Sequence, residues 1–150
     1  MVPLSTDGAF GESQGRELSV DGISIGVSES TIASMLSSAS SRCWLQDDNL
    51  TLLTFQPDRQ LAVYIDQGGS VVRVEYGERL DDQGRTIIKK GDPIGMVETI
   101  LGKPNSISDI SCGMKDEPPT TMRSFNVSGL RLEIFSVDSL VEAIDLEAQT

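Results

Sequence analysis

The stretch from Ile88 to Pro104, IKKGDPIGMVETILGKP, contains a helix start, an apolar helical face and a helix stop in that order. Asp92 is suited to cap a helix whose first residue is Pro93, because proline fits the first helical turn and an aspartate can accept bonds from its free amides. Gly102 and Pro104 then end the pattern. The apolar face is predicted at helical spacing by Ile94, Val97, Ile100 and Leu101.

A second, earlier helix is expected after Ser28. Ile32, Met35 and Leu36 follow at the spacing of one helical face. The hydroxyl of Ser28 can accept a bond from an amide of the first turn, which makes it a plausible N-cap. This helix is expected to end between Ser37 and Ala39.

Each predicted helix is followed by three segments with strand patterns. Leu61, Val63 and Ile65 alternate with polar or smaller residues, and Val72 and Val74 do so in the next segment. Glycine- and proline-containing turns separate the segments, so each set of three segments is predicted to form an antiparallel meander with one buried face. The predicted strands are residues 49–55, 59–66 and 71–76, and residues 121–127, 129–135 and 140–146.

The two halves of the chain also match each other in sequence. Gly26, Ile32, Met35 and Leu36 align with Gly91, Val97, Ile100 and Leu101, and Phe55 aligns with Phe125. The order helix, strand, strand, strand therefore occurs twice. We predict an α+β fold in which two tandem repeats of a helix and a three-stranded antiparallel meander pack into one domain. The predicted boundaries are a flexible leader at 1–20, repeat 1 at 21–80 and repeat 2 at 86–147.

The segment from Ile88 to Pro104 resembles the signature of the SmpA/OmlA-like superfamily. This superfamily includes the small lipoprotein of the outer-membrane β-barrel assembly machine and the tandem repeats of β-lactamase inhibitor proteins. The resemblance implies a scaffold, an assembly factor or an inhibitor that binds another protein through an exposed sheet face or through loops. It also implies an extracytoplasmic location if a leader has been removed, and a cytoplasmic one is expected otherwise, since residues 1–20 do not read as an intact signal peptide.

The composition argues against several classes of function. The 150 residues include 12 Lys and Arg against 23 Asp and Glu, which gives a formal net charge of −11, and there is no histidine. A nucleic-acid-binding protein needs a basic face, and anionic membranes repel an acidic chain. Without histidine, Ser-His-Asp and Cys-His nucleophiles are excluded, and so are the imidazole ligands of zinc. We expect no cofactor, no bound metal and no membrane insertion.

Three acidic pairs are expected in loops: Asp47 with Asp48, Asp81 with Asp82, and Asp116 with Glu117. Their spacing is not that of a calcium loop, so we interpret them as solvated turns or, together, as an acidic patch for a basic partner. Trp44 is interpreted either as a lid over the sheet or, if exposed, as a partner-binding anchor. The candidate partner-binding residues are Trp44, Asp47, Asp48, Asp116 and Glu117.

Cys43 and Cys112 fall at corresponding places in the two halves, each before the aligned phenylalanine. They could form a disulfide between the halves, or each could be an unpaired thiol. Two cysteines without a histidine do not form a plausible zinc site.

Three functions are compatible with these observations. The first is a non-enzymatic protein-binding module. The second is an acidic inhibitor or immunity protein that blocks a basic enzyme, which would associate with its target fast and in a salt-sensitive way. The third is a small enzyme based on carboxylates, which would need two acidic side chains that converge in a pocket.

Overall fold

A large antiparallel sheet forms the body of the protein. The computed structural model describes residues 16–35, 39, 41–55, 60–110 and 119–149. Eight strands are ordered β2-β3-β4-β5-β11-β10-β9-β8, so each half of the chain supplies four neighbouring strands and β5 pairs with β11 in the middle. In chain order the strands are β2 (Ser41–Leu45), β3 (Leu50–Thr54), β4 (Ala62–Ile65), β5 (Val71–Gly77), β8 (Ser106–Asp109), β9 (Thr120–Val127), β10 (Leu130–Val137) and β11 (Leu140–Ala148).

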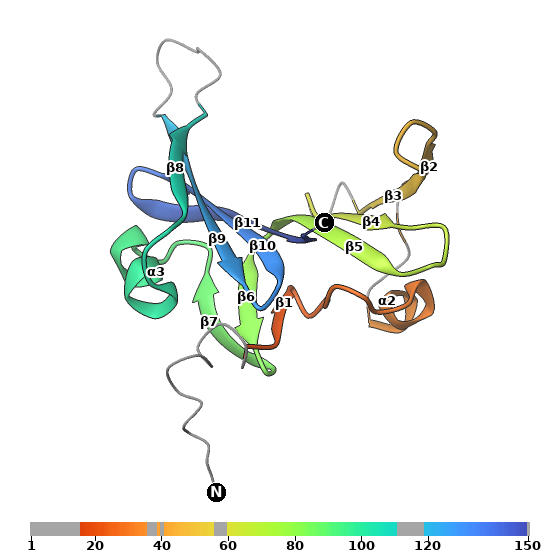
Figure 1. The fold of residues 1–150 in the computed structure, drawn as a ribbon, viewed down its shortest axis with the longest axis horizontal. Helices are drawn as coiled ribbons and strands as arrows, with labels where there is room; N and C mark the ends of the chain where they lie inside the picture. Colours follow the sequence, from red (N-terminus) through yellow and green to blue (C-terminus); the bar gives the residue numbers. More distant parts are fainter. Residues whose placement is uncertain (1–15, 36–38, 40, 56–59, 111–118, 150) are drawn as a thin grey trace, which may run out of the picture.

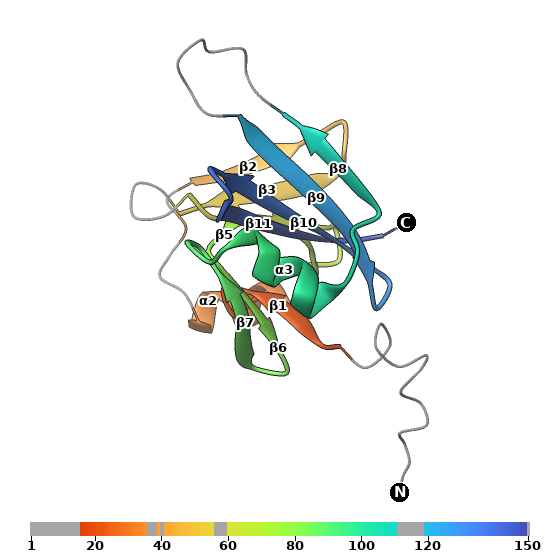
Figure 2. The same cartoon turned by 90° about the vertical axis from the view of Figure 1, so that its left-hand side faces the viewer.

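Two helices and a second, smaller sheet lie on one side of the large sheet (Figures 1 and 2). The helices are α2 (Glu29–Met35) and α3 (Ile94–Leu101). The smaller sheet has the order β1-β6-β7, formed by β1 (Leu18–Val20), β6 (Arg79–Asp82) and β7 (Arg85–Lys89). The fold is therefore predominantly antiparallel β-structure with two short helices.

The hydrophobic core lies between the large sheet and these covering elements. Alternate residues of the central strands point into it, as the two-residue period of a strand requires. The alternation is broken at register shifts, so the buried valine that precedes Val74 on β5 is Val71, and Val72 is only half-buried. Burying these aliphatic side chains fixes which face of the sheet is covered. The core includes Ile32 of α2, Val97 of α3, Val20, Leu80 and Ile88 of the smaller sheet, and Leu53, Val63, Val74, Leu132, Ile134, Ile144 and Leu146 of the large sheet.

The turn before each helix is bonded to the sheet in the same way in both halves. The amide of Gly26 donates to the carbonyl of Val71, and the amide of Gly91 donates to the carbonyl of Val141, both at 2.8 Å. Each of these valine amides donates back to the residue that follows the glycine, at 2.8 and 2.9 Å. Both glycines have a left-handed φ, 96° and 94°, which glycine adopts at little cost.

The helix ends agree in part with the predicted caps. The amide of Thr31 donates to the Ser28 hydroxyl at 3.4 Å, so the cap predicted for the first helix is confirmed. Gly102 ends α3 with a φ of 88°, also as predicted. The prediction for Asp92 is wrong: its carboxylate accepts from the amide of Lys89 at 2.9 Å and closes the preceding turn, while Pro93 occupies the N-cap position.

Several predicted boundaries differ from the structure. The leader predicted at 1–20 extends too far, because residues 18–20 form β1 and Leu18 and Val20 are buried; residues 1–15 lie outside the described residues. Each four-stranded half has one strand more than the predicted meander, because β2 and β8 occupy segments that were expected to be loops. Both are edge strands exposed along nearly their whole length, so they have no buried face and no alternating pattern to predict them.

Residues 81–85, which separate the two predicted repeats and were expected to hold Asp81 and Asp82 in a loop, belong instead to the hairpin that joins β6 to β7. Gln83 and Gly84 form its turn, and both have positive φ, at 54° and 82°. A two-residue turn of this kind is common in hairpins and favours glycine, so the Gln-Gly pair was a signal for it.

Candidate functional site

The face of the large sheet that points away from the helices carries a cluster of charged side chains. In the part of the chain that the structure describes, no helix or strand covers this face, which we call the open face (Figures 1 and 2). Its residues alternate with the core residues on the same strands. The charged members are Arg73 and Glu75 on β5, Arg131 and Glu133 on β10, and Asp145 and Glu147 on β11.

Ion pairs and a hydrogen bond connect these side chains across four strands. Glu147 lies between two guanidinium groups, 3.5 Å from Arg73 and 3.4 Å from Arg131. Arg73 also pairs with Glu75, which accepts a hydrogen bond from the Tyr64 hydroxyl at 3.0 Å. The guanidinium carbon of Arg73 lies 5.6 Å from the centre of the Tyr64 ring, within the range of a cation–π contact. A continuous chain of contacts therefore runs from β4 to β10.

Asp145 is the most buried member of the cluster, with 7% of its surface exposed. Its carboxylate accepts a hydrogen bond from the backbone amide of Tyr76 at 2.8 Å. Burial raises the pKa of Asp145 to about 7; the bond from Tyr76 works against this, while Glu75 and Glu133 nearby raise the pKa further. Its titration therefore falls near neutral pH.

The bond from Tyr76 occurs at an irregularity in the middle of the sheet. The register between β5 and β11 shifts between Ile144 and Leu146, so Asp145 lies opposite two residues of β5. Tyr76 has a left-handed φ of 60°, which is unusual for a residue other than glycine. The Asp145 carboxylate satisfies the amide that this bulge removes from the ladder.

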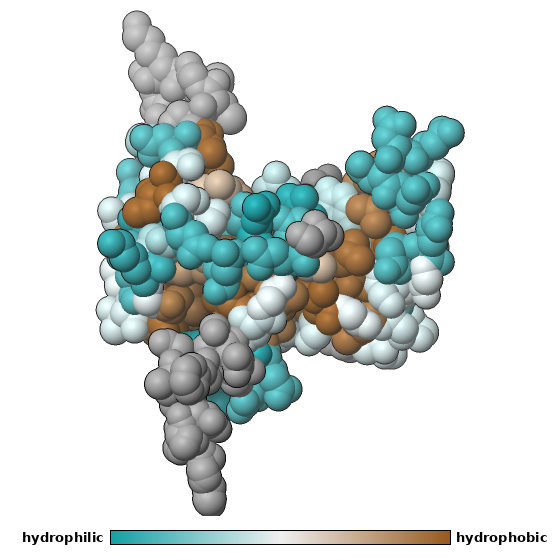
Figure 3. Space-filling model, viewed as in Figure 1, coloured by the Kyte–Doolittle hydropathy of each residue, from teal (hydrophilic) through white to brown (hydrophobic). Residues whose placement is uncertain are grey.

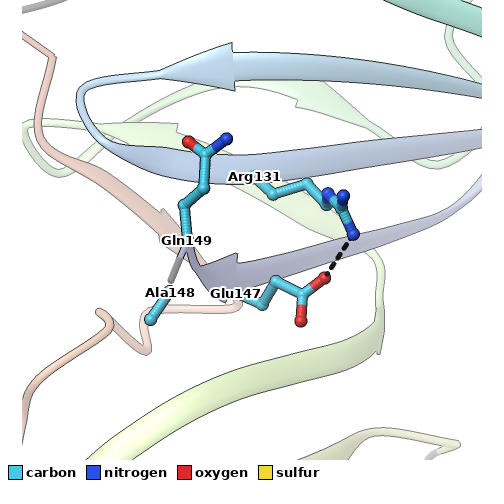
Figure 4. A pocket seen from close by; sticks show the side chains of 4 residues that line it. All are labelled: Arg131, Glu147, Ala148 and Gln149. Atoms are coloured by element: carbon cyan, nitrogen blue, oxygen red, sulfur yellow. Dashed lines mark hydrogen bonds and ion pairs between the residues drawn. The ribbon is translucent and has the colours of Figure 1, made fainter.

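A small polar pocket opens beside the cluster at the end of β11. Its volume is about 170 Å³, and it is lined by Arg131, Glu147, Ala148 and Gln149. Figure 4 shows Arg131 and Glu147 pointing toward each other across neighbouring strands, with Gln149 beside them. Figure 3 shows the open face from its edge as a shallow hollow between two raised ends of the sheet. Among the described residues, no group of three or more Cys, Asp or Glu is arranged to hold a metal ion.

The predicted site residues lie elsewhere. Trp44 is on β2 at the edge of the sheet with 51% of its surface exposed, and Asp47 and Asp48 are exposed in the turn that follows. The structure therefore brings these three together at one edge, away from the open-face cluster. Asp116 and Glu117 lie outside the described residues, so their part in a partner-binding patch stays a prediction.

The acidic pair at Asp81 and Asp82 is not a solvated turn. Asp81 is buried on β6 and accepts bonds from Thr86 at 2.8 Å and from Arg79 at 3.2 Å. Asp82 accepts bonds from the side chain of Arg16 and the amide of Glu17, both at 3.0 Å. Both residues belong to the β6–β7 hairpin, and this pairing, which was not predicted, accounts for their contacts.

Whether Cys43 and Cys112 form a disulfide or stay unpaired thiols remains open, because Cys112 lies outside the described residues. Cys43 is an exposed thiol on β2. The strand β8, which ends shortly before Cys112, is at the opposite edge of the eight-stranded sheet from β2.

The charged residues of the open face were not predicted as a site from the sequence. In segments such as VVRVEY and LRLEIF their alternation is that of any solvent-facing strand positions. The one usable signal was Asp145, an aspartate between two buried aliphatic residues in a strand that pairs at the centre of the sheet.

None of the helices in the described part of the chain has the length and apolar character needed to span a membrane.

Comparison with known proteins gives a likeness of fold only. No family model matches the chain, and no curated protein matches it in sequence. The chain is similar to a cysteine-rich secretory protein of Staphylococcus aureus, with a TM-score of 0.61 and 12% identity over 92% of this chain and 47% of that one. It thus spans about half of the staphylococcal protein, and at this identity the likeness concerns the fold alone.

Two further solved structures are more distant. A DUF4309 family protein of Bacillus subtilis has a TM-score of 0.48 at 10% identity, covering 86% of this chain and 84% of that one. A proposed β-lactamase inhibitor protein of Streptococcus mutans has a TM-score of 0.35 at 12% identity, covering 97% and 96%. Scores below 0.5 carry no functional argument. Membership of the SmpA/OmlA-like superfamily stays a prediction.

Proposed function

We propose that the protein is a non-enzymatic binding module whose open face receives a protein partner with basic side chains. The observation that carries the proposal is the charged cluster on that face, which has four carboxyl groups but only two guanidinium groups. The excess of acid favours a cationic partner, and the net charge of −11 would speed its approach.

The geometry of the cluster supports binding more than catalysis. Asp145, whose pKa of about 7 would suit a general acid, is nearly buried and holds the backbone amide of Tyr76. A buried carboxyl group that is hydrogen-bonded to the backbone in this way is poorly placed to reach a substrate. Glu133 is half-buried beside it and is available to a side chain that docks on the face.

We further propose that the chain consists of two tandem units, at residues 21–80 and 86–147. The matching bonds at Gly26 and Gly91 support this organisation, and so does the sheet order, in which each half contributes four consecutive strands. The seam between the units then runs between β5 and β11, and the charged cluster lies across it.

An acidic inhibitor or immunity protein would use the same face, and the two roles differ only in what binding does to the partner. Adding this chain to a purified basic partner with a measurable activity separates them. Loss of that activity in proportion to occupancy indicates an inhibitor, and unchanged activity indicates a scaffold or assembly factor.

The proposal is tested by capture from an extract of the source cells with wild-type chain and two charge-matched variants. Glu133→Lys changes the open face, whereas Asp47→Lys makes the same change of charge on the turn after β2. We expect the wild-type chain and Asp47→Lys to retain the same partner proteins at low salt, and Glu133→Lys to lose them. These proteins should be released from the wild-type chain as the salt concentration rises. Retention lost with Asp47→Lys and kept with Glu133→Lys would move the site to the acidic turn and refute an open-face site.

A further inference from the structure

Within the described part of the chain, strand β2 has an unpaired outer edge. It pairs with β3 over five consecutive residues, from Ser41 to Leu45, and it is the last strand on its side of the large sheet. Four of its five residues are exposed and the fifth is half-buried. Its outer backbone groups are therefore available to another strand.

This edge carries little of what usually prevents edge-to-edge pairing. Natural proteins protect such edges with charged side chains, especially lysine, with proline, with bulges or with very short strands. The one charge on β2 is Arg42, which is paired with Glu29. The sequence SRCWL contains no lysine and no proline, and its register with β3 shows no irregularity. In addition, its tryptophan, Trp44, has 51% of its surface exposed.

We propose that two copies of this chain join through β2, as an antiparallel pair around a two-fold axis at Cys43. In this register Arg42 lies opposite Trp44 of the second copy, and the relation occurs twice because of the symmetry. A guanidinium group beside an indole ring forms a favourable cation–π pair. The guanidinium of Arg42 is already held by the carboxylate of Glu29, which leaves its flat face available to the ring.

The charge distribution supports this arrangement although each copy is strongly acidic. In each copy Asp47 lies four residues along the chain from Cys43, where the proposed axis passes. The two Asp47 residues are therefore on opposite sides of the axis. At about 3.4 Å per residue the two acidic turns are roughly 27 Å apart. That separation exceeds the Debye length of about 8–10 Å at ordinary ionic strength, so their repulsion is largely screened.

Pairing of β2 with β2 also closes on itself. An isologous contact uses the same surface on both copies and ends at a dimer, whereas β2 paired with the opposite edge, β8, would generate an open-ended series. The proposal is independent of the open face, so Glu133→Lys is expected to leave the dimer unchanged.

Two substitutions at Trp44 test the register. Trp44→Arg would place like charges opposite each other, and Trp44→Glu would place a carboxylate opposite Arg42. We expect Trp44→Arg to raise the dimer dissociation constant by ~10-fold or more, and Trp44→Glu to keep it within about 3-fold of wild type. Analytical ultracentrifugation over a range of concentrations under reducing conditions measures both, and circular dichroism checks the fold. Equal weakening by both variants, or a wild-type chain that stays monomeric at about 1 mM, a weak-affinity limit, would overturn the proposal.

A thiol test reports the same register independently. Opposite residues of an antiparallel pair have Cβ atoms about 4.5–5.5 Å apart, close to the separation in a disulfide. In a Cys112→Ser chain, diamide would take two hydrogens from two Cys43 thiols and leave a disulfide-linked dimer. The control carries Ser108→Cys on β8 with both native cysteines replaced by serine, and it is expected to stay monomeric. Crosslinking of the control but not of Cys43 would refute pairing through β2.

Discussion

Asp145 on β11 accepts a hydrogen bond from the backbone amide of Tyr76 on β5, with 2.8 Å between oxygen and nitrogen. The bond crosses the middle of the sheet, where the strands of the two halves of the chain meet. It also lies inside the charged cluster of the open face. One carboxyl group therefore holds an irregular backbone in place and contributes to the charge that a partner would meet.

Replacing Asp145 with asparagine should change how stability depends on pH. Asparagine keeps an oxygen that can accept the Tyr76 amide, but it cannot ionise. In the native protein the pKa of Asp145 is raised to about 7, mainly by burial, so the folded state keeps a proton that the unfolded state loses near pH 4. The free energy of unfolding of the wild type, relative to Asp145→Asn, should fall as pH rises from 4 to 7 and then level off.

We expect this relative fall to be on the order of 2–4 kcal/mol, at about 1.4 kcal/mol per unit of pKa. Urea unfolding at pH 4, 5, 6, 7 and 8 measures it. Glu142→Gln removes an exposed carboxylate from the same strand and serves as the control. If the free energy of unfolding of wild type and Asp145→Asn changed with pH in parallel, Asp145 would have the same pKa in the folded and unfolded states, which would contradict the prediction.

The sequence predicted the parts of the fold that a local pattern determines. The helix before Gly102 and the six strands with alternating aliphatic residues were recognised because one face of each is buried. Trp44 was found as a candidate, but whether it was a lid or an exposed anchor depended on its place at the sheet edge. A tertiary arrangement decides that question, and no local pattern encodes it.

The open-face cluster could not be predicted for a related reason. Arg73 and Glu147 are far apart in the chain and become neighbours only through the pairing of β5 with β11. Each reads by itself as an ordinary polar position on a strand. The pairing of the two halves at this seam, which brings the residues together, is a long-range contact without a local signal.

Gly77 should be important for stability because strand β1 passes very close to it. A Cβ atom at this position would lie 2.0 Å from Cγ1 of Val20 on β1, well inside contact distance. Gly77→Ala should therefore lower the free energy of unfolding by about 2–3 kcal/mol, since the well-packed core must shift. Gly95→Ala is the control: it lies on α3 with nothing within 4 Å of the added methyl group, and should raise stability by ~0.5–1 kcal/mol. Thermal unfolding of both variants measures these changes. A Gly77→Ala chain as stable as the wild type would contradict the prediction.

Asp21 holds the connection between β5 and β6. One of its carboxylate oxygens accepts bonds from the amides of Glu78 at 3.0 Å and Arg79 at 2.9 Å. Asp21→Ala should cost about 1–3 kcal/mol because two partly buried amides lose their acceptor. Asp21→Asn keeps an acceptor oxygen and tolerates the left-handed φ of 52°, so it should cost much less. Hydrogen exchange at the Glu78 and Arg79 amides should accelerate in Asp21→Ala only; equal acceleration in both variants would show that the negative charge matters instead.

Tyr64 offers an optical report on the cluster. Its pKa is raised to about 12 by burial and by its hydrogen bond to Glu75. Because this folded-state pKa is above the unfolded value near 10, the stability that Tyr64 contributes should be lost as pH rises from about 10 through 12. In an ultraviolet titration, one tyrosine should ionise near pH 12, and Tyr64→Phe should remove that step. Glu75→Gln should lower its midpoint, because the neighbouring negative charge and the acceptor carboxylate are lost. A midpoint that Glu75→Gln leaves unchanged would mean that burial alone sets the ionisation of Tyr64, and that its bond to Glu75 adds little to the cluster.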